Sequence, residues 1–309
     1  MSGSVACKRC DGSGFDPESN LTIKPREKMN VLHYAQQISN EEYHSRPCMS
    51  ASGLKTFLKS PAHYKAAMED RSDTPAFRIG RMVHSAVLEP GTFSDMYQMF
   101  DGDRRTKDGK ADWQAILDAG AEPIKREELD LCESIRSACG HLFPKGGHPE
   151  LSFKAEINGV LCQCRPDWLV IDGSTLRMYD LKTCLDASAA DRVIYSYGYH
   201  IQSVFYQMVL RKVFRDEGLA IEPIEFVFAE KKPPYDVVVR QIDPDIVPAV
   251  EQLILDALET FKACKSTGEW PGTEPDHECK IASAPSWIIN GLMPDMDLTG
   301  FYGEENEAC

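Results

Sequence analysis

Apolar residues recur along this chain with two different periods, and each period predicts its own kind of element. Between residues 39 and 142 they return every three or four positions, which is typical of amphipathic helices. Between residues 159 and 183 they return every second position or run unbroken, which is typical of strands. The later expected elements are helices at 186–214 and 244–264 and strands at 224–229 and 235–242. This order predicts an α/β fold, in which a small mixed central sheet is flanked by helices and follows an N-terminal helical portion.

The strongest strand signal begins at Asn158-Gly159, a dipeptide typical of two-residue hairpin turns. The strand ELSFKAEI, which starts at Glu150, is expected to pair through this turn into a central hairpin. The run 168–171 is apolar on both faces, as in a strand at the centre of a sheet. A turn at 172–174 then reverses the chain, so we expect residues 176–181 to form the next strand.

This hairpin predicts a cluster of charged residues. Strands paired across a tight turn can bring Asp167 and Asp180 together, and Lys182 shares a face with Asp180 because strand side chains repeat every two residues. Two adjacent buried carboxylates are costly, and a divalent cation such as Mg²⁺ or Mn²⁺ removes that cost. Lys182 should remain protonated beside these acids, where it could orient a water and stabilise charge on a phosphoryl oxygen.

The acid-x-Lys spacing is weak support when taken alone. An acidic chain produces such triplets by chance, and they also occur at 108–110, 230–232 and 278–280. The triplet at 180–182 differs because it ends a strand that follows a Pro-Asp strand. The alternative is a surface Asp–Lys pair beside a hairpin turn.

Length and charge restrict the class of protein. A chain of 309 residues can bury a large core, as one big domain or one with appended segments. Its net charge of −14 argues against a sequence-independent DNA coat, but not against an enzyme with a locally basic channel. There is neither an apolar run near 18 residues nor an apolar signal segment, so we expect a cytoplasmic protein. The 11 scattered cysteines favour reduced thiols.

The two ends differ in composition from the predicted domain at 29–272. Residues 1–28 are polar and rich in Gly and Ser, which predicts a flexible tail, and residues 273–309 form an acidic, turn-rich extension. Cys7 and Cys10 resemble half of a zinc knuckle, but structural zinc needs four ligands and the chain has no second CxxC. Three further residues could complete such a site, namely His33, His44 and Cys48, but nothing in their spacing requires it. We therefore favour a tail without zinc.

Three residues stand out on predicted helices. His84 lies on the apolar stripe of a helix at 75–89, where a lone histidine is usually a satisfied core residue. Gln202 and Tyr206 are four positions apart and share one face of the helix at 186–214. The first half of that helix is rich in aromatic residues at Tyr195, Tyr197, Tyr199 and His200. Such residues could contact bases or sugars, although packing against the sheet is the default explanation.

Residues 101–112 form the most basic loop of the chain. Its four cations could grip phosphates, and they are Arg104, Arg105, Lys107 and Lys110. The alternative is a solvated loop whose interspersed aspartates balance the charge.

Four collinear motifs resemble the RecE-type exodeoxyribonucleases (exonuclease eight), which belong to the PD-(D/E)xK superfamily. The motifs are GRMVHSAVLEP, CRPDWLV, YDLKT and YHIQSVFYQM. The opening ISNEEYHSRPCMSASGLKTFL, the loop RRTKDGK and a closing EW-P extend the likeness over about residues 38–271. Four motifs in order are far more specific than one acid-x-Lys triplet, and they imply a restriction-endonuclease-like core.

The resemblance implies a role for each residue that matches a motif. A metal would be held by His84, Asp167, Asp180 and the main-chain carbonyl of Leu181, while Lys182 would hold and activate the attacking water. For His84 this implied role replaces the expectation that a lone histidine is structural.

Other positions match the family less completely. Gln202 and Tyr206 correspond to its Q-x-x-x-Y helix, which lines the active site and is thought to position a DNA phosphate. Glu150 resembles an acid on the strand before the Pro-Asp strand, with a less defined role. Ser60 replaces the first cysteine of the iron–sulfur relatives, and Cys264 and Cys279 are too sparse for the remaining cluster, so we expect no iron–sulfur centre.

The implied activity is Mg²⁺-dependent hydrolysis of double-stranded DNA from its ends, with Mn²⁺ as an alternative cation. The resemblance also implies 5′→3′ digestion that leaves 3′ single strands, a ring-shaped homo-oligomer and a single-strand annealing protein as recombination partner. One alternative is a RecB-like or restriction-type nuclease with endonucleolytic or single-strand preference. Another is an adaptor that binds DNA ends through an inactive nuclease core.

Overall fold

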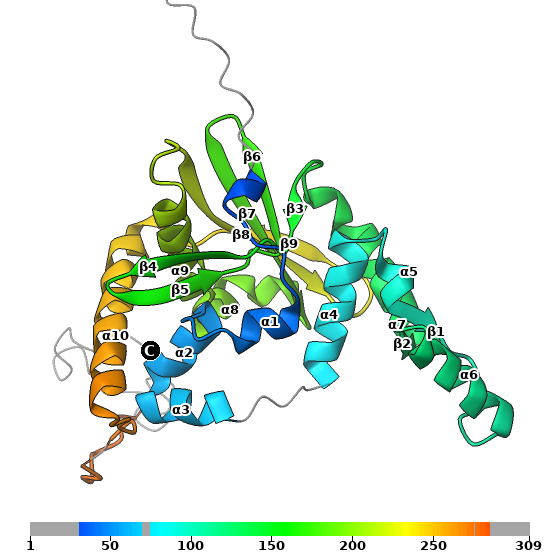
Figure 1. The fold of residues 1–309 in the computed structure, drawn as a ribbon, viewed down its shortest axis with the longest axis horizontal. Helices are drawn as coiled ribbons and strands as arrows, with labels where there is room; N and C mark the ends of the chain where they lie inside the picture. Colours follow the sequence, from blue (N-terminus) through cyan, green and yellow to red (C-terminus); the bar gives the residue numbers. More distant parts are fainter. Residues whose placement is uncertain (1–30, 70–74, 275, 285–309) are drawn as a thin grey trace, which may run out of the picture.

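The computed structural model describes residues 31–69, 75–274 and 276–284 (Figure 1). The predicted tail at 1–28, with Cys7 and Cys10, lies outside the described residues, as does most of the predicted acidic extension. In the part that is described, no helix is both long and apolar enough to cross a membrane.

A mixed five-stranded sheet forms the centre of the fold, as predicted. Its strands, in spatial order, are β3 (His148–Pro149), β6 (Trp168–Asp172), β7 (Thr175–Cys184), β8 (Ala220–Glu230) and β9 (Val237–Arg240). β7 and β8 are parallel, whereas the other neighbouring pairs are antiparallel. The parallel pair requires a helical crossover, which the chain between Ala187 and Val213 supplies.

Helices surround this sheet and supply most of the remaining structure (Figure 1). Before the sheet the chain forms α1 (Asn40–Ser45), α2 (Ala51–Lys59), α3 (Pro61–Glu69), α4 (Pro75–Leu88), α5 (Phe93–Met96), α6 (Lys107–Asp118) and α7 (Arg126–Cys139). Later helices are α8 (Ala190–Ser196), α9 (Tyr199–Val213) and α10 (Val247–Thr267). Short 3₁₀ turns lie at Val31–His33, Gly140–Leu142, Ala187–Ala189 and Pro244–Ile246.

The two faces of the sheet are covered by separate cores. Leu176 and Met178 of β7 pack with α2, α9 and α10 in the larger core. Tyr179 and Leu181 pack in a second core with buried residues of α4 and α7. Figure 1 shows α10 on one side of the sheet and α4 and α7 on the other. Since strand side chains alternate between faces, β7 contributes buried side chains to both cores.

The hairpin through Asn158-Gly159 forms as predicted, but it does not join the central sheet. β4 (Phe153–Ile157) pairs only with β5 (Val160–Cys164), in a separate two-stranded sheet. The prediction that ELSFKAEI continues into the central hairpin was therefore wrong. Its first residues are not part of β4, and Glu150 has a positive φ of 45°, which interrupts extended structure.

Two further expectations change at helix ends. The long helix predicted at 186–214 is divided into α8 and α9 by Gly198, whose φ of 66° lies in the left-handed region and ends regular helix. The basic loop predicted at 101–112 becomes helical from Lys107, because the Thr106 side chain accepts a hydrogen bond from the amide of Gly109 and caps α6.

The larger core predicts which apolar side chains determine stability. Phe205 lies on α9 and is fully buried, so Phe205→Ala should lower the free energy of unfolding by about 3–5 kcal/mol through lost burial and the cavity left behind. Leu185 is 73% exposed, and Leu185→Ala should change it by less than about 0.5 kcal/mol. Urea denaturation of both variants checks this, and equal effects would contradict the assignment of the core.

Candidate active site

The β6–β7 hairpin places the two predicted aspartates across from each other. Trp168 is paired with Tyr179 in the antiparallel register, so Asp167 and Asp180 occupy the next opposed positions. Leu181 donates its amide to Oδ2 of Asp167 at 2.8 Å, which fixes the Asp167 carboxylate against the end of β7. The turn between the strands contains Gly173 at a φ of 60°, a conformation that glycine adopts without strain.

Asp180 is the most deeply buried acid of this cluster, with 1% of the residue exposed. Gln202 of α9 donates its Nε2 to Oδ2 of Asp180 at 2.6 Å, and Lys182 forms an ion pair with Oδ1. The Lys182 ammonium also lies 3.5 Å from Oε1 of Gln202. These three side chains therefore form one network on the α9 face of the sheet.

His84 reaches the same cluster from the other side, on α4. Its Nδ1 lies 3.5 Å from Oδ2 of Asp167, and its Nε2 lies 2.8 Å from the carbonyl oxygen of Leu181. A residue that is 97 positions away from Leu181 in sequence thus contacts both an acid and the backbone of the Asp-x-Lys strand. His84 is therefore part of the cluster and not an isolated core histidine.

The pKa values of the cluster are shifted because two acids and only one lysine are buried together. Burial, reinforced by the neighbouring Asp180, raises the pKa of Asp167 to about 6. Burial alone would lower the pKa of Lys182, but the carboxylates of Asp180 and Asp167 outweigh it and raise that pKa. Lys182 is therefore an ammonium at neutral pH, and the two acids still carry one more charge than this single cation balances when both are ionised.

The donor atoms of this cluster are suited to a hard divalent cation. Two carboxylates and the Leu181 carbonyl offer oxygen ligands, and Oδ1 of Asp180 is buried against the Lys182 ammonium, with which it forms an ion pair. No group of three or more His, Cys, Asp or Glu side chains is gathered tightly enough in the described part of the chain to hold a metal by itself. A metal would therefore need the Leu181 carbonyl, which His84 contacts in this structure.

Gln202 and Tyr206 lie on the same face of α9, as their spacing predicted, and both are buried. Gln202 holds the Asp180 carboxylate, and the hydroxyl of Tyr206 donates to the carbonyl of Arg165 at 3.2 Å. Burial keeps the pKa of Tyr206 well above its ordinary value, so this hydroxyl remains a donor. In this structure the two residues support the strands that carry the acids.

Glu150 lies beside the cluster without joining its network. Its amide donates to the carbonyl of Asp167 at 3.1 Å, while its carboxylate lies 3.9 Å from Arg165. Arg165 also stacks over the ring of Tyr43 at 4.4 Å from the ring centre. Glu150 thus fixes the backbone just before β6, and its carboxylate balances an arginine.

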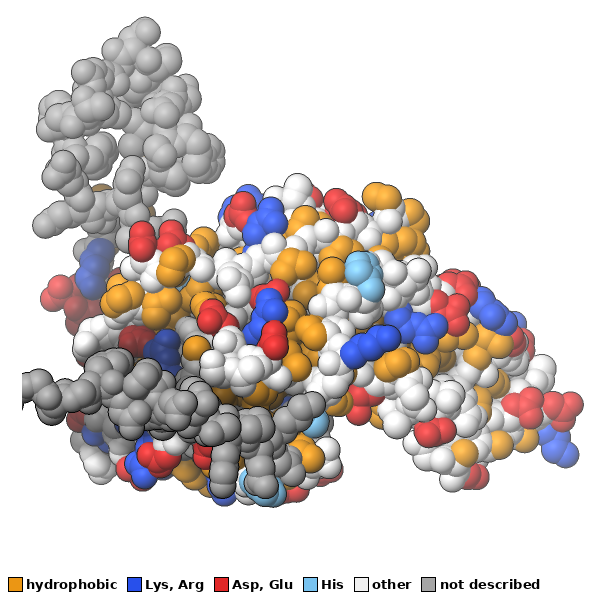
Figure 2. All heavy atoms as spheres, turned by 90° about the horizontal axis from the view of Figure 1, so that it is seen from above, with side chains coloured by type: hydrophobic (Ala, Val, Ile, Leu, Met, Phe, Trp, Pro, Cys, Tyr) orange, Lys and Arg blue, Asp and Glu red, His pale blue; other side chains and the backbone are white. Residues whose placement is uncertain are grey.

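The four predicted DNA-contacting cations lie elsewhere, at the start of α6 and just before it. Figure 1 shows α6 at the outer tip of an arm, well apart from β6 and β7. Arg105 is bound by Asp103, with a nitrogen–oxygen distance of 2.9 Å, and Arg104 lies over the ring of Trp113. Lys107 and Lys110 are exposed. On the face seen in Figure 2 the described basic and acidic side chains are interspersed.

Tyr199 and Lys55 complete the surroundings of Lys182, and the sequence reasoning missed Lys55. The ring of Tyr199 lies 4.6 Å from the Lys182 ammonium, and Lys55 of α2 approaches the same ring at 5.2 Å. Burial, followed by the charge of Lys182, lowers the pKa of Lys55 to about 8. The tyrosine-rich start of α9 hinted at such contacts, but no pattern in the sequence pointed to Lys55.

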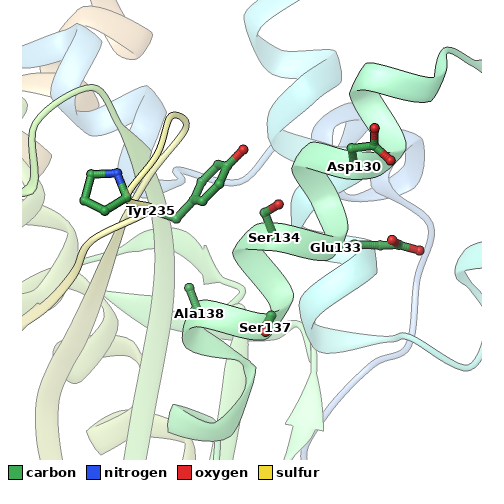
Figure 3. Close-up of a pocket in the computed structure, with 7 residues that line it drawn as sticks. Asp130, Glu133, Ser134, Ser137, Ala138 and Tyr235 are labelled. Carbon is green, nitrogen blue, oxygen red and sulfur yellow. The ribbon is translucent and has the colours of Figure 1, made fainter.

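A groove of about 620 Å³ lies apart from these residues (Figure 3). α7 and the segment at Pro234 and Tyr235 form its walls, and Asp130 and Glu133 make it acidic. An acidic surface repels phosphate, so this groove is a poor candidate for the nucleic-acid site.

The paired acids, the Asp-x-Lys strand and the Q-x-x-x-Y helix are the features by which this site resembles those of the PD-(D/E)xK nuclease superfamily. Residues 50–282 match the family described as "PDDEXK-like domain of unknown function (DUF3799)", and the chain belongs to this family. Every residue of the cluster lies within the matched range.

The fold is also shared with a solved structure. A crystal structure of a "Putative exonuclease" from Eubacterium rectale is similar at a TM-score of 0.53 and 17% sequence identity. The match covers 84% of this chain and 100% of that one. At this identity the likeness concerns the fold alone. A comparison with curated proteins finds no match.

The raised pKa of Asp167 predicts a pH dependence of stability in metal-free protein. The folded state holds this proton more tightly than the unfolded chain, so the resulting stabilisation is complete below about pH 4 and is lost as the pH rises through about 6. Asp167→Asn should therefore flatten the decline in the free energy of unfolding over that window. Urea titrations in the presence of a chelator measure it, and an unchanged slope would contradict the assignment.

Proposed function

We propose that this protein is a Mg²⁺-dependent exodeoxyribonuclease of the RecE type, which hydrolyses double-stranded DNA from its ends. The observation that carries the proposal is the convergence of His84 with the opposed acids of the β6–β7 hairpin and with Lys182. Membership of the PDDEXK-like family supports a nuclease, and the four collinear motifs favour the RecE type. The 5′→3′ direction, a ring-shaped oligomer and an annealing partner are proposed from that resemblance.

The chain's own residues determine what the site can do. Lys182 is held as an ammonium by the Asp180 carboxylate, beside the position where a scissile phosphate would meet the acids. It can donate a hydrogen bond to an attacking water and stabilise negative charge that develops on a phosphoryl oxygen. Gln202 prevents the Asp180 carboxylate from rotating, because it binds the oxygen that Lys182 does not.

A divalent cation would be held by Asp167, Asp180, the Leu181 carbonyl and His84. When bound, such a cation polarises a phosphate and lowers the pKa of a bound water. The excess negative charge of the two acids over the single Lys182 cation favours cation binding here. Binding would exchange the hydrogen bond between His84 and Leu181 for contacts to the metal.

The activity is tested by Asp180→Asn, with Asp172→Asn as a matched control on the exposed end of the same hairpin. Asp180→Asn should reduce release of nucleotides from linear duplex DNA by about a thousandfold or more, because it removes a ligand worth several kcal/mol. Asp172→Asn should retain activity. Hydrolysis is followed as acid-soluble label with and without Mg²⁺.

The form of the DNA separates the proposed reaction from an endonuclease with the same residues. An enzyme that starts from ends should digest linear duplex and leave covalently closed circles intact. Equal digestion of both forms would show an endonuclease, and binding without any hydrolysis would show an inactive adaptor.

Metal binding can be measured independently of catalysis. We expect millimolar Mg²⁺ to raise the melting temperature of the wild type and of Asp172→Asn, because a ligand that binds only the folded state stabilises it. For Asp180→Asn the increase should disappear. An equal increase in all three proteins would place the metal elsewhere.

A further inference from the structure

Tyr197 is an exposed tyrosine that is linked to Lys182 through one intervening aromatic ring, that of Tyr199. Tyr197 is 65% exposed, and its ring stacks on that of Tyr199, with ring centres 6.0 Å apart and planes 21° from parallel. Tyr199 in turn contacts the Lys182 ammonium and stacks on Phe226 of β8. A continuous line of contacts therefore runs from the sheet, past Lys182, to an aromatic ring in solvent.

The backbone that presents this ring is held firmly. Tyr197 follows the last residue of α8, and the next residue, Gly198, turns the chain into α9 with a φ of 66°. Lys55 donates its ammonium to the carbonyl of Tyr197 at 3.3 Å, and its alkyl chain lies so near Gly198 that an added Cβ would come within 2.8 Å of it. The backbone that carries the exposed ring is thus held by α2 and by the α8–α9 junction.

The charge beside the Tyr199 ring, on which Tyr197 stacks, is positive and only partly balanced by carboxylates. Lys182 is paired with Asp180, whereas Lys55 has no carboxylate within ion-pair distance in the described part of the chain. Two ammonium groups therefore flank Tyr199, each within 5.2 Å of its ring centre. An exposed aromatic face beside ammonium groups suits a nucleotide, which offers a flat base and an anionic phosphate.

We propose that Tyr197 is a stacking platform for an unpaired nucleobase of the strand whose phosphate lies at Lys182. Packing alone does not require an aromatic ring here, because most of its surface contacts no part of the protein. A base can lie flat on Tyr197 only after it has left its own stack in the duplex. The inference rests on the proposed nuclease function and deepens it, since it makes local unpairing next to the cleavage point part of substrate binding.

An abasic scan tests the proposal in the full-length chain. Fluorescently labelled linear DNA with a single abasic analogue at each of the terminal positions is titrated against the Asp180→Asn protein, in which hydrolysis is suppressed. We expect one position at which loss of the base weakens binding about tenfold, within the range that base–aromatic stacking provides.

Substitutions of Tyr197 then assign that loss to the ring. In the Asp180→Asn background, Tyr197→Ala should bind intact DNA about tenfold more weakly and show no further loss at the sensitive abasic position. Tyr197→Phe should behave as the parent, because it keeps the aromatic face. Tyr195→Ala is the matched control: Tyr195 is also exposed on α8, but its ring packs against His200.

The outcomes separate this inference from the proposed function. If the wild type digests linear DNA but Tyr197→Ala retains the full abasic effect, or no position shows such an effect, the platform is refuted while the nuclease function stands. If the wild type neither binds nor digests DNA, both proposals fail.

Discussion

The burial of two carboxylates beside each other is the constraint on which this structure depends. Asp180 is almost completely enclosed, and Asp167 is held by the backbone of the opposite strand. Uncompensated buried charge is costly, and removal of one partner from a buried pair typically costs about 3–5 kcal/mol. Three neighbouring groups contact the carboxylates and offset this cost: the ammonium of Lys182, the amide of Gln202 and the imidazole of His84.

Each compensating group comes from a different element, so the geometry of the site depends on how β7, α9 and α4 pack together. The β6–β7 hairpin opposes the acids, α9 brings Gln202 across one face of the sheet, and α4 brings His84 to the other. Loss of any one contact would leave a buried charge with less support. The two cores that secure α9 and α4 to opposite faces of β7 are therefore also the foundation of the site.

The site also explains how a chain with a net charge of −14 could act on DNA. Attraction for a phosphate need not come from the whole surface, because a small group of well-placed cations can act locally. Lys182 and Lys55 provide such a group around Tyr199, next to the acids that would hold a cation. The predicted basic segment near Arg105 lies on a separate arm, where Asp103 already binds the arginine.

The sequence by itself determined the local parts of this protein. The alternation of apolar residues and the turn at 172–174 were sufficient to predict the β6–β7 hairpin, and with it the opposition of Asp167 and Asp180, because register follows from turn and pleat. The four-residue spacing predicted that Gln202 and Tyr206 share a helix face. Motif resemblance, and not periodicity, pointed to His84.

Only the tertiary structure decided which distant segments meet. It placed the β4–β5 hairpin outside the central sheet, brought His84 of α4 to Leu181 of β7 and brought Lys55 of α2 to Tyr199 of α9. These contacts join residues far apart in the chain, and they depend on how helices pack across a sheet. Such packing is set by the sum of many weak apolar contacts, which no local pattern of residues encodes.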